Sequence, residues 1–466
     1  DHKDRLKFIT EFTGSFGLAL ILKQKNFLFV DGRYTLQAKI QSGKDYEIKT
    51  FPETTPSRVL KNKKKRIGYD PKLMTKNTLN FFFKNTFSEL IPIEFNLIDQ
   101  IWKKNGLVKK SKFYHLPDKI VGLTSKKKLE KVTINLKKKK ADYQFISSSE
   151  NIAWLLNIRG KDSKYTPVPN CHALLNNKKE IILFCDLNKI SLSFRKKFKN
   201  VKFISETKIE YILDDIKNKS FIIDQKSCSI FFENKILLNN KILCRIDPIY
   251  FLKSIKENKE INNIKKVHIE DGIALTKYLF WVKKNFLKKK VTEISGEKKL
   301  LELRKKNKSF KFSSFPTISG TGANGAIVHY KANKNTNKKL RKGDIYLVDS
   351  GGQYNYGTTD VTRTISLHNN SRKIKDIFTR VLKGHIAVAS YKLNNKTSGK
   401  MLDKVARKYL KEKNLDYAHG TGHGVGYFLN VHEGPQAITN NNLVQLKEGM
   451  IVSNEPGFYE NGKFGI

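Results

Sequence analysis

Four side chains of types that bind divalent metal ions lie in the last third of the chain. Asp349 ends an apolar β-type segment, and Asp360 precedes another. His423 lies in a glycine-rich stretch, and Glu455, in Asn-Glu-Pro-Gly, follows an apolar run at residues 449–452 that predicts a strand. Two aspartates, one histidine and one glutamate form a ligand set that suits manganese, cobalt or zinc in a two-metal centre. The pattern predicts metal-assisted chemistry at a single site.

The segments that carry Asp349 and Asp360 predict that the two carboxylates meet. Residues 345–349 and 360–365 are typical of two antiparallel strands joined by a turn, which brings the strand ends together. A lone aspartate at a strand end more often caps a turn than binds a metal. Because histidines and a further acidic residue follow in glycine-rich surroundings, we expect both aspartates at one site.

Three further histidines accompany these residues. His419 shares the stretch His-Gly-Thr-Gly-His-Gly-Val-Gly with His423, and His432 follows in Val-His-Glu-Gly-Pro. This stretch contains too much glycine for a helix, so its two histidines need not share a helical face as in a helical zinc motif. His329, in Gly-Ala-Ile-Val-His-Tyr, would by itself be interpreted as a structural histidine at a strand end.

The patterns along the chain predict the elements that must position these side chains. Two β-type runs, 18–22 and 27–30, predict a hairpin followed by a helix, and strand and helix patterns then alternate through the first half. From Leu252 apolar residues recur at three- and four-residue spacings, which predicts a long helix. Two more amphipathic helices are expected after Ser371, a predicted N-cap, and around Leu402.

The domain organisation follows from this change of pattern. At 466 residues the chain exceeds the usual size of one domain. We predict an α/β (α+β) protein with two N-terminal α/β domains, residues 1–118 and 119–250, and a third domain, residues 251–466, that carries the chemistry.

The formal net charge of +47 would suit a polyanionic partner. The lysines are spread along the whole chain in short runs, and no motif of DNA- or RNA-reading domains is present. We therefore expect no specific nucleic-acid partner. The hydrophobic content of 39% is too high for a disordered chain despite the charge.

Cysteines and hydropathy indicate the cellular compartment. Four cysteines in so long a chain, without metal-ligand spacing, do not form a disulfide framework. No apolar run reaches the ~18 residues of a membrane span, and residues 1–5 show no signal-peptide pattern. We expect a cytoplasmic protein that does not associate with membranes.

Several long motifs occur in an order that identifies a family. They are Val348-Asp349-Ser350-Gly351, Thr359-Asp360-Val361-Thr362-Arg363-Thr364, the stretch 419–426, Val431-His432-Glu433-Gly434-Pro435 and Glu455-Pro456-Gly457-Phe458-Tyr459-Glu460-Asn461-Gly462. Residues 29–34 and 154–160 extend the likeness toward the N-terminus. Together they closely resemble the three-domain cytosolic type of the aminopeptidase P family. The resemblance implies two creatinase-like domains followed by a catalytic domain with the pita-bread fold.

The resemblance also implies an activity. Such an enzyme is a metal-dependent aminopeptidase that hydrolyses the bond between an N-terminal residue and a following proline, through a hydroxide bridging two divalent ions. Manganese is the expected metal, with zinc or cobalt as alternatives. Asp349 would hold one ion, Asp360 would bridge both, and His423 and Glu455 would hold the other. Glu455 would also be the general base.

Further residues take their roles from the resemblance alone. His329, His419 and His432 would line the substrate pocket and take part in catalysis, with His432 delivering a proton to the departing nitrogen. Arg33 would lie at the edge of the substrate site, in a protein that forms the homodimer usual for the family. The partners would be peptides with proline in second position.

The family supplies one ligand that residues 1–466 do not contain. It is a second bridging glutamate, in an Arg-x-Glu-Asn segment directly after a Lys-Phe-Gly-Ile like the one at residues 463–466. We expect the catalytic domain to be truncated at its C-terminus. Without that carboxylate, the two cations would repel each other with less compensation, and the metal pair would bind poorly.

Other functions remain alternatives, both as a different peptidase and as a protein without catalysis. A prolidase would share the fold but cleave only Xaa-Pro dipeptides. A methionine aminopeptidase would share the aspartate pair but would not need the long N-terminal region. A non-catalytic pita-bread module that binds peptides or proteins would be expected to lack the four metal-binding side chains, all of which are present here.

Overall fold

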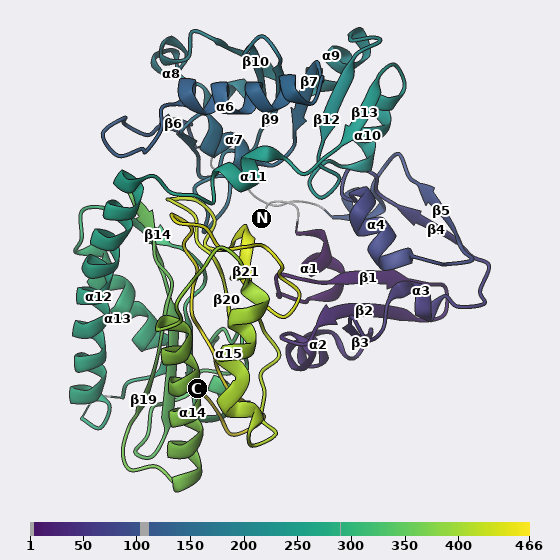
Figure 1. Cartoon of the computed structure of the whole chain (residues 1–466). Helices are drawn as coiled ribbons and strands as arrows, with labels where there is room; N and C mark the ends of the chain where they lie inside the picture. Colours follow the sequence, from purple (N-terminus) through teal and green to yellow (C-terminus); the bar gives the residue numbers. More distant parts are fainter. Residues whose placement is uncertain (1–3, 103–110, 289) are drawn as a thin grey trace. The chain divides into compact units, whose positions relative to one another are not determined.

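A computed structural model describes residues 4–102, 111–288 and 290–466 of the chain. The chain packs into two compact units. Unit 1 comprises Asp1–Pro117, Leu123–Lys164 and Val168–Tyr250, and unit 2 comprises Asp118–Gly122, Tyr165–Pro167 and Phe251–Ile466. Both units mix helices and sheets, as the α/β prediction expects (Figure 1). Within the described ranges, no helix is long and apolar enough to cross a membrane.

Unit 1 begins with a three-stranded sheet. Strands β1 (Leu18–Ile21) and β2 (Asn26–Asp31) form the predicted antiparallel hairpin, and β3 (Glu47–Phe51) runs parallel to β2. Helix α2 (Thr35–Ser42) makes the parallel connection, because parallel strands need a crossover. The other elements of this region are α1 (Arg5–Thr10), α3 (Pro56–Val59), β4 (Arg66–Tyr69), α4 (Lys76–Phe83), β5 (Glu89–Pro92) and α5 (Leu97–Ile101).

A six-stranded mixed sheet forms the rest of unit 1, in the order β11-β10-β9-β7-β12-β13. Its strands are β7 (Tyr143–Ile146), β9 (His172–Asn176), β10 (Ile181–Cys185), β11 (Val201–Ser205), β12 (Ser220–Ile223) and β13 (Lys241–Cys244). The apolar residues of these strands pack with helices α9 (Ile209–Asp215) and α10 (Ile230–Leu237) in one core. The remaining elements are β6 (Tyr114–His115), α6 (Ser125–Lys138), α7 (Ser149–Leu155), β8 (Ile158–Arg159), η1 (Leu187–Lys189), α8 (Leu192–Lys197), η2 (Glu206–Lys208) and α11 (Pro248–Leu252).

Unit 2 contains the predicted long helix, α12 (Asn258–Asn285). Its buried side chains recur every three or four positions, so one face packs against α13 (Glu293–Lys305) and the sheet of this unit. The two other predicted helices are α14 (Arg372–Ala389) and α15 (Gly399–Lys411), which pack against each other (Figure 1). The Ser371 side chain accepts a hydrogen bond from the Ile374 amide and caps α14 as expected.

The strands of unit 2 form small antiparallel sheets. One has the order β15-β16-β19 and another β14-β17-β18. Their bounds are β14 (Phe310–Ser313), β15 (Ile318–Thr321), β16 (Ile345–Ser350), β17 (Gly352–Tyr354), β18 (Gly357–Thr358) and β19 (Val361–Ser366), with η3 (Gly322–Ala326) after β15. Two pairs follow, β20 (Gly422–Gly424) with β21 (Glu433–Ile438) and β22 (Tyr459–Glu460) with β23 (Phe464–Gly465).

The strand expected at residues 449–452, just before Glu455, is not formed. Gly449 has φ +86°, outside the range of a strand. Beyond it the segment changes partners at almost every residue: Met450 bridges to Ile255, and Val452 bridges to Gly424. A ladder needs one continuous partner, so this prediction was wrong, although the segment still leads Glu455 to the site.

Candidate metal centre

Asp360, His423 and Glu455 lie together in unit 2. Each offers one ligand atom, and these atoms are all within 4.8 Å of one another. Nε2 of His423 lies 3.2 Å from Oδ2 of Asp360 and 3.1 Å from Oε1 of Glu455. Nε2 is buried, yet it makes no aligned hydrogen bond within the described part of the chain. The three atoms therefore converge as ligands do around a shared cation.

The antiparallel pairing of β16 with β19 positions the two aspartates, as predicted. Ser350 lies opposite Val361 in this pair, so Asp349 and Asp360 flank the same end of the ladder. Oδ1 of Asp349 is buried and has no hydrogen-bond partner among the described residues. Burial raises the pKa of Asp349 well above its ordinary value, and the charges of Asp360 and Glu455 raise it further. All three carboxyl groups thus act on one another.

Glycines let the segment that carries Glu455 approach the segment of His423 closely. A Cβ on Gly422 would lie 2.0 Å from the Ser453 carbonyl oxygen, so no larger residue fits there. The Ser453 amide donates to the His423 carbonyl at 2.8 Å, and the Glu455 amide donates to the Thr421 carbonyl at 2.8 Å. The glycine-rich composition of this stretch is therefore a requirement of close backbone packing beside the site.

Ser453 is a site residue that the sequence did not reveal. Its hydroxyl donates to Oε1 of Glu455 at 2.5 Å and accepts a hydrogen bond from the His423 amide at 2.9 Å. One hydroxyl therefore fixes both the backbone of one candidate ligand and the carboxylate of another. No sequence signal distinguishes this serine from any other, since its role depends on the pairing of two distant segments.

The electrostatics of the cluster fit a cation. Burial alone would lower the pKa of His423, but contacts with Asp360 and Glu455 outweigh it and raise the pKa to about 10. Burial also raises the pKa of Asp360, whereas His423 lowers the pKa of Glu455 against the effect of burial. The carboxylates thus draw positive charge to this point. Two divalent ions would supply it, and oxygen and imidazole donors match manganese, cobalt or zinc.

His432 and His419 both lie next to these residues. The ring centroid of His432 is 4.1 Å from that of His423. Nε2 of His419 lies 3.0 Å from the Tyr459 hydroxyl, and the charge of His419 acts on Glu455. Burial and the charges of Asp349 and Glu455 raise the pKa of Tyr459. Tyr459 thus borders the site as well, a position that its place in Glu-Pro-Gly-Phe-Tyr could have suggested.

His329 lies in the turn after η3, half-buried, rather than at the end of a strand. The η3 turn packs against β16, which carries Asp349, and against β22, which carries Tyr459. The loop that carries His329 therefore lines the same region of unit 2 as Asp349 and Tyr459. The substrate-binding role of His329 stays a prediction.

Arg33 belongs to unit 1 and has a local partner. Its guanidinium Nη2 lies 2.7 Å from Oδ2 of Asp31. The side-chain hydrogen bond to Asp31 raises the pKa of Arg33, and burial opposes that rise. Its expected place at the edge of the substrate site stays a prediction.

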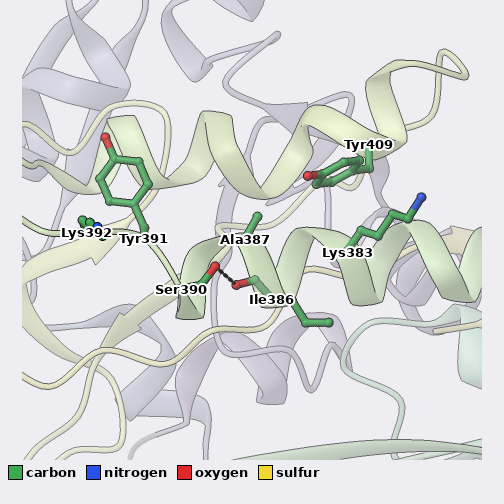
Figure 2. A pocket seen from close by; sticks show the side chains of 7 residues that line it. All are labelled: Lys383, Ile386, Ala387, Ser390, Tyr391, Lys392 and Tyr409. Atoms are coloured by element: carbon green, nitrogen blue, oxygen red, sulfur yellow. Dashed lines mark hydrogen bonds between the residues drawn. The ribbon is translucent and has the colours of Figure 1, made fainter.

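A surface depression of about 600 Å³ lies on α14 and α15, apart from these residues (Figure 2). Ser390 donates to the Ile386 carbonyl at 2.8 Å within it. Its lining is Lys383, Ile386, Ala387, Ser390, Tyr391, Lys392 and Tyr409. None of the candidate site residues is among them, so the depression adds nothing to the metal centre.

Comparison with known proteins identifies the family. The profile of Metallopeptidase family M24 matches residues 262–466, and profiles of the Creatinase/Prolidase N-terminal domain match residues 1–100 and 106–260. Xaa-Pro aminopeptidase 1 of Dictyostelium discoideum is 37% identical over 99% of this chain and 77% of its own length. The chain belongs to the Xaa-Pro aminopeptidases of family M24. It is also 36% identical to Xaa-Pro aminopeptidase ApepP of Drosophila melanogaster, over 100% of this chain and 79% of that protein.

Solved structures of similar proteins confirm the expected fold. The crystal structure of X-prolyl aminopeptidase from Caenorhabditis elegans, described as a cytosolic enzyme with a di-nuclear active site, has a TM-score of 0.94. The two are 30% identical, over 100% of this chain and 79% of that one. A prolidase from Pyrococcus horikoshii, 24% identical with a TM-score of 0.60 over 73% of this chain and 93% of its own, shows the fold alone.

These findings confirm the predicted family, the α/β fold with creatinase-like and M24 domains, and the enzyme class. The predicted domain boundaries, after residues 118 and 250, stay predictions. The profile matches change at 100–106 and at 260–262, and unit 2 includes two short segments from the first half of the chain.

Proposed function

We propose that this chain hydrolyses the peptide bond between an N-terminal residue and a following proline, with two divalent metal ions, manganese first among them. The convergence of His423 Nε2 on the carboxylates of Asp360 and Glu455 carries the proposal, since imidazole nitrogen and carboxylate oxygens are donors that bind divalent cations. The names of the related Xaa-Pro aminopeptidases support the substrate class.

A bond before proline suits this kind of site. The amide is tertiary, has no N–H, and includes a ring that interferes with the extended grip of ordinary peptidases. A metal centre recognises the carbonyl oxygen instead, and the walls of a pocket select the ring by shape. We assign these walls to His329, His419 and His432, which belong to the same unit as the cluster.

In this proposal, Asp349 and Asp360 would hold one ion, and Asp360, His423 and Glu455 would hold the other. When bound there, divalent ions would supply Lewis acidity toward the scissile carbonyl and the attacking water. Glu455 accepts the proton of that water, because its Oε1 is at the point where the ligand atoms converge. Ser453 donates to the same Oε1 and so holds the carboxylate in place.

The departing proline nitrogen needs a proton, because it becomes a basic secondary amine. His432 is the residue that we assign to this step, since its ring lies beside His423 at the edge of the cluster. His419 is held by the Tyr459 hydroxyl at 3.0 Å and is assigned to substrate contact. Neither assignment requires the side chain to be a metal ligand.

The setting of the enzyme is proposed from its relatives and from its composition. A cytoplasmic location is supported by the cytosolic Caenorhabditis elegans enzyme and by four cysteines that are all free. A homodimer stays a prediction from the family resemblance, which sedimentation of the full-length protein would test. The absence of nucleic-acid and membrane partners stays a prediction from the sequence.

Substrate preference tests the proposal. The full-length protein with Mn²⁺ is given an Xaa-Pro-Xaa tripeptide, the matched Xaa-Ala-Xaa tripeptide and an Xaa-Pro dipeptide. Release of the first residue from the proline tripeptide, much faster than from the alanine one, supports the aminopeptidase. Cleavage of the dipeptide alone would identify a prolidase. No cleavage by the metal-loaded protein would leave a binding module.

A further inference from the structure

A buried ion pair joins the two long helices behind the candidate metal centre. Arg304 near the end of α13 is 1% exposed, and Asp271 in the middle of α12 is 2% exposed. Nε of Arg304 donates to Oδ1 of Asp271 at 2.7 Å, and Nη2 donates to Oδ2 at 2.9 Å. This two-pronged geometry fixes both side chains relative to each other.

Asp271 reaches the segment that leads into Asp360. The Thr359 hydroxyl donates to Oδ2 of Asp271 at 2.9 Å and also accepts from the Gly352 amide at 2.9 Å. The Tyr354 hydroxyl donates to Oδ1 at 2.6 Å. Thr359 is the residue directly before Asp360, so Asp271 fixes the backbone from which that candidate ligand extends.

Arg304 reaches the segment that leaves Asp349. Its Nη2 donates to the Ser350 hydroxyl at 3.1 Å, and its Nη1 donates to the Gly351 carbonyl at 3.5 Å. Successive side chains of a strand point to opposite faces, so Ser350 faces the helices while Asp349 faces the other way. The ion pair thus holds this strand end from the face opposite to the Asp349 carboxylate.

The two held segments also contact each other without spare room. A Cβ on Gly351 would lie 2.0 Å from the Thr359 carbonyl oxygen, and that oxygen accepts from Ser314 at 2.9 Å. Arg304 holds one side of this contact and Asp271 holds the other. Asp349 and Asp360 are the chain neighbours of Ser350 and Thr359. The ion pair therefore fixes the separation between the two aspartates.

Stability alone does not account for such a pair. Removing two charges from water costs about as much as their attraction returns, so a buried pair contributes little net stability. Here the further hydrogen bonds of both side chains go to the hairpin that carries the two aspartates. The effect of the pair is therefore on geometry, and metal affinity is the property that depends most directly on ligand geometry.

We propose that Arg304 and Asp271 are positioning residues of the metal centre, which act through Ser350 and Thr359 to set the spacing of Asp349 and Asp360 and hence the affinity for divalent ions. This inference rests on the proposed metal centre but not on the peptide that is cleaved. It adds two residues outside the motifs to those that determine metal binding.

The test measures Mn²⁺ binding by the full-length protein through the electron paramagnetic resonance signal of free Mn²⁺. Thr359→Val removes the hydroxyl that donates to Asp271 and nearly preserves the side-chain volume, and Thr359→Ser retains the hydroxyl. Thr321→Val is the matched control, because Thr321 is also buried and donates its hydroxyl to a carboxylate, Asp344 at 3.1 Å. Thermal unfolding of each metal-free protein is recorded alongside.

The proposal predicts that Thr359→Val raises the dissociation constant for Mn²⁺ about tenfold or more, as for other partners of ligand segments. Thr359→Ser and Thr321→Val are expected to stay close to the wild type. Arg304→Lys keeps the charge but loses the two-pronged contact, so it is expected to weaken binding as well. If Thr359→Val does not fold, Arg304→Lys is the variant that tests the proposal.

Unchanged Mn²⁺ affinity in folded Thr359→Val or Arg304→Lys would overturn the proposal, as would an equal loss in Thr321→Val. A lower unfolding temperature of the metal-free variant with wild-type affinity would show a purely structural role. A wild-type protein that binds Mn²⁺ but cleaves no proline peptide would contradict the proposed function and leave this inference intact.

Discussion

Nε2 of His423 lies 3.1 Å from Oε1 of Glu455, although the two residues come from separate segments of the chain. Glycine at position 422 makes this approach possible, because any Cβ there would collide with the backbone of Ser453. The same imidazole lies 3.2 Å from Asp360. Three motifs that are separate in the sequence therefore meet at one point, where a cation would balance their charge.

Metal removal should destabilise unit 2. A ligand that binds only the folded state stabilises it by about 3 kcal/mol when its free concentration is about a hundred times the dissociation constant. We expect a chelator to lower the unfolding temperature by several degrees and Mn²⁺ to restore it. Calorimetry of the full-length protein measures this shift. His423→Ala should abolish the shift, whereas the exposed control His368→Ala should keep it.

Ser453→Ala should weaken the centre without removing a candidate ligand. The substitution deletes the hydroxyl that donates to Glu455 at 2.5 Å and accepts from the His423 amide. We expect Mn²⁺ affinity to fall about tenfold, as for other residues that orient ligands. Isothermal titration measures it. Wild-type affinity in this variant would show that the serine does not position Glu455.

Substitution of His432 and substitution of His423 should have different effects. The two rings are neighbours, at 4.1 Å between centroids, but only His423 has an atom among the converging ligand atoms. His423→Ala should therefore lose metal binding, whereas His432→Ala should keep it and lose kcat by about a hundredfold, the size of a general-acid contribution. Metal titration and steady-state kinetics give both values. Loss of metal by His432→Ala would contradict the assignment.

Glu293→Gln should destabilise the loop that carries His329. This fully buried carboxylate accepts hydrogen bonds from Thr321, Asn324, Tyr330 and Lys338. An amide would present N–H groups to some of these donors, at a cost of about 1–3 kcal/mol. Thermal unfolding measures the loss, with exposed Glu302→Gln on the same helix as control. Equal stability of the two variants would contradict the role of Glu293.

His172 in unit 1 should make stability depend on pH. Burial lowers its pKa from 6.5 to about 4. Below pH 6.5 the unfolded chain takes up a proton there that the folded chain takes up only near pH 4. Stability is therefore lost as the pH falls through this window, and the loss levels off below it. One pKa unit corresponds to about 1.4 kcal/mol, so the extent is about 3 kcal/mol at most.

Urea unfolding at a series of pH values measures this dependence for the wild type and His172→Gln. The difference between the two should shrink or reverse as the pH falls from 6.5 to 4. The exposed His368→Gln serves as control. Parallel curves for wild type and His172→Gln would show that this histidine does not titrate in the window.

The parts of the site that the sequence predicted are those that local rules determine. Asp349 and Asp360 lie close together because antiparallel pairing brings strand ends together. The glycines around His423 excluded a helix, and His423 lies in a strand. The helix after Ser371 follows from its cap and its periodicity. These signals lie within a few residues of the positions that they predict.

The parts that the sequence did not predict depend on contacts between distant segments. Asp271 lies among mostly apolar residues on the buried face of its helix, and only the packed structure shows that Arg304 pairs with it. Ser453 acquires its role from pairing with the His423 segment. The expected strand at residues 449–452 failed for the same reason, since pairing partners rather than apolar residues decide whether a strand forms.

The central claim is metal-dependent cleavage before proline, and one measurement tests it most directly. Release of the first residue from an Xaa-Pro-Xaa tripeptide is followed for the full-length protein and for Glu455→Gln, each with Mn²⁺ and with a chelator. The account predicts release by the wild type with Mn²⁺ only, and a loss of at least about a hundredfold in Glu455→Gln. Equal release with chelator, or by Glu455→Gln, would contradict it.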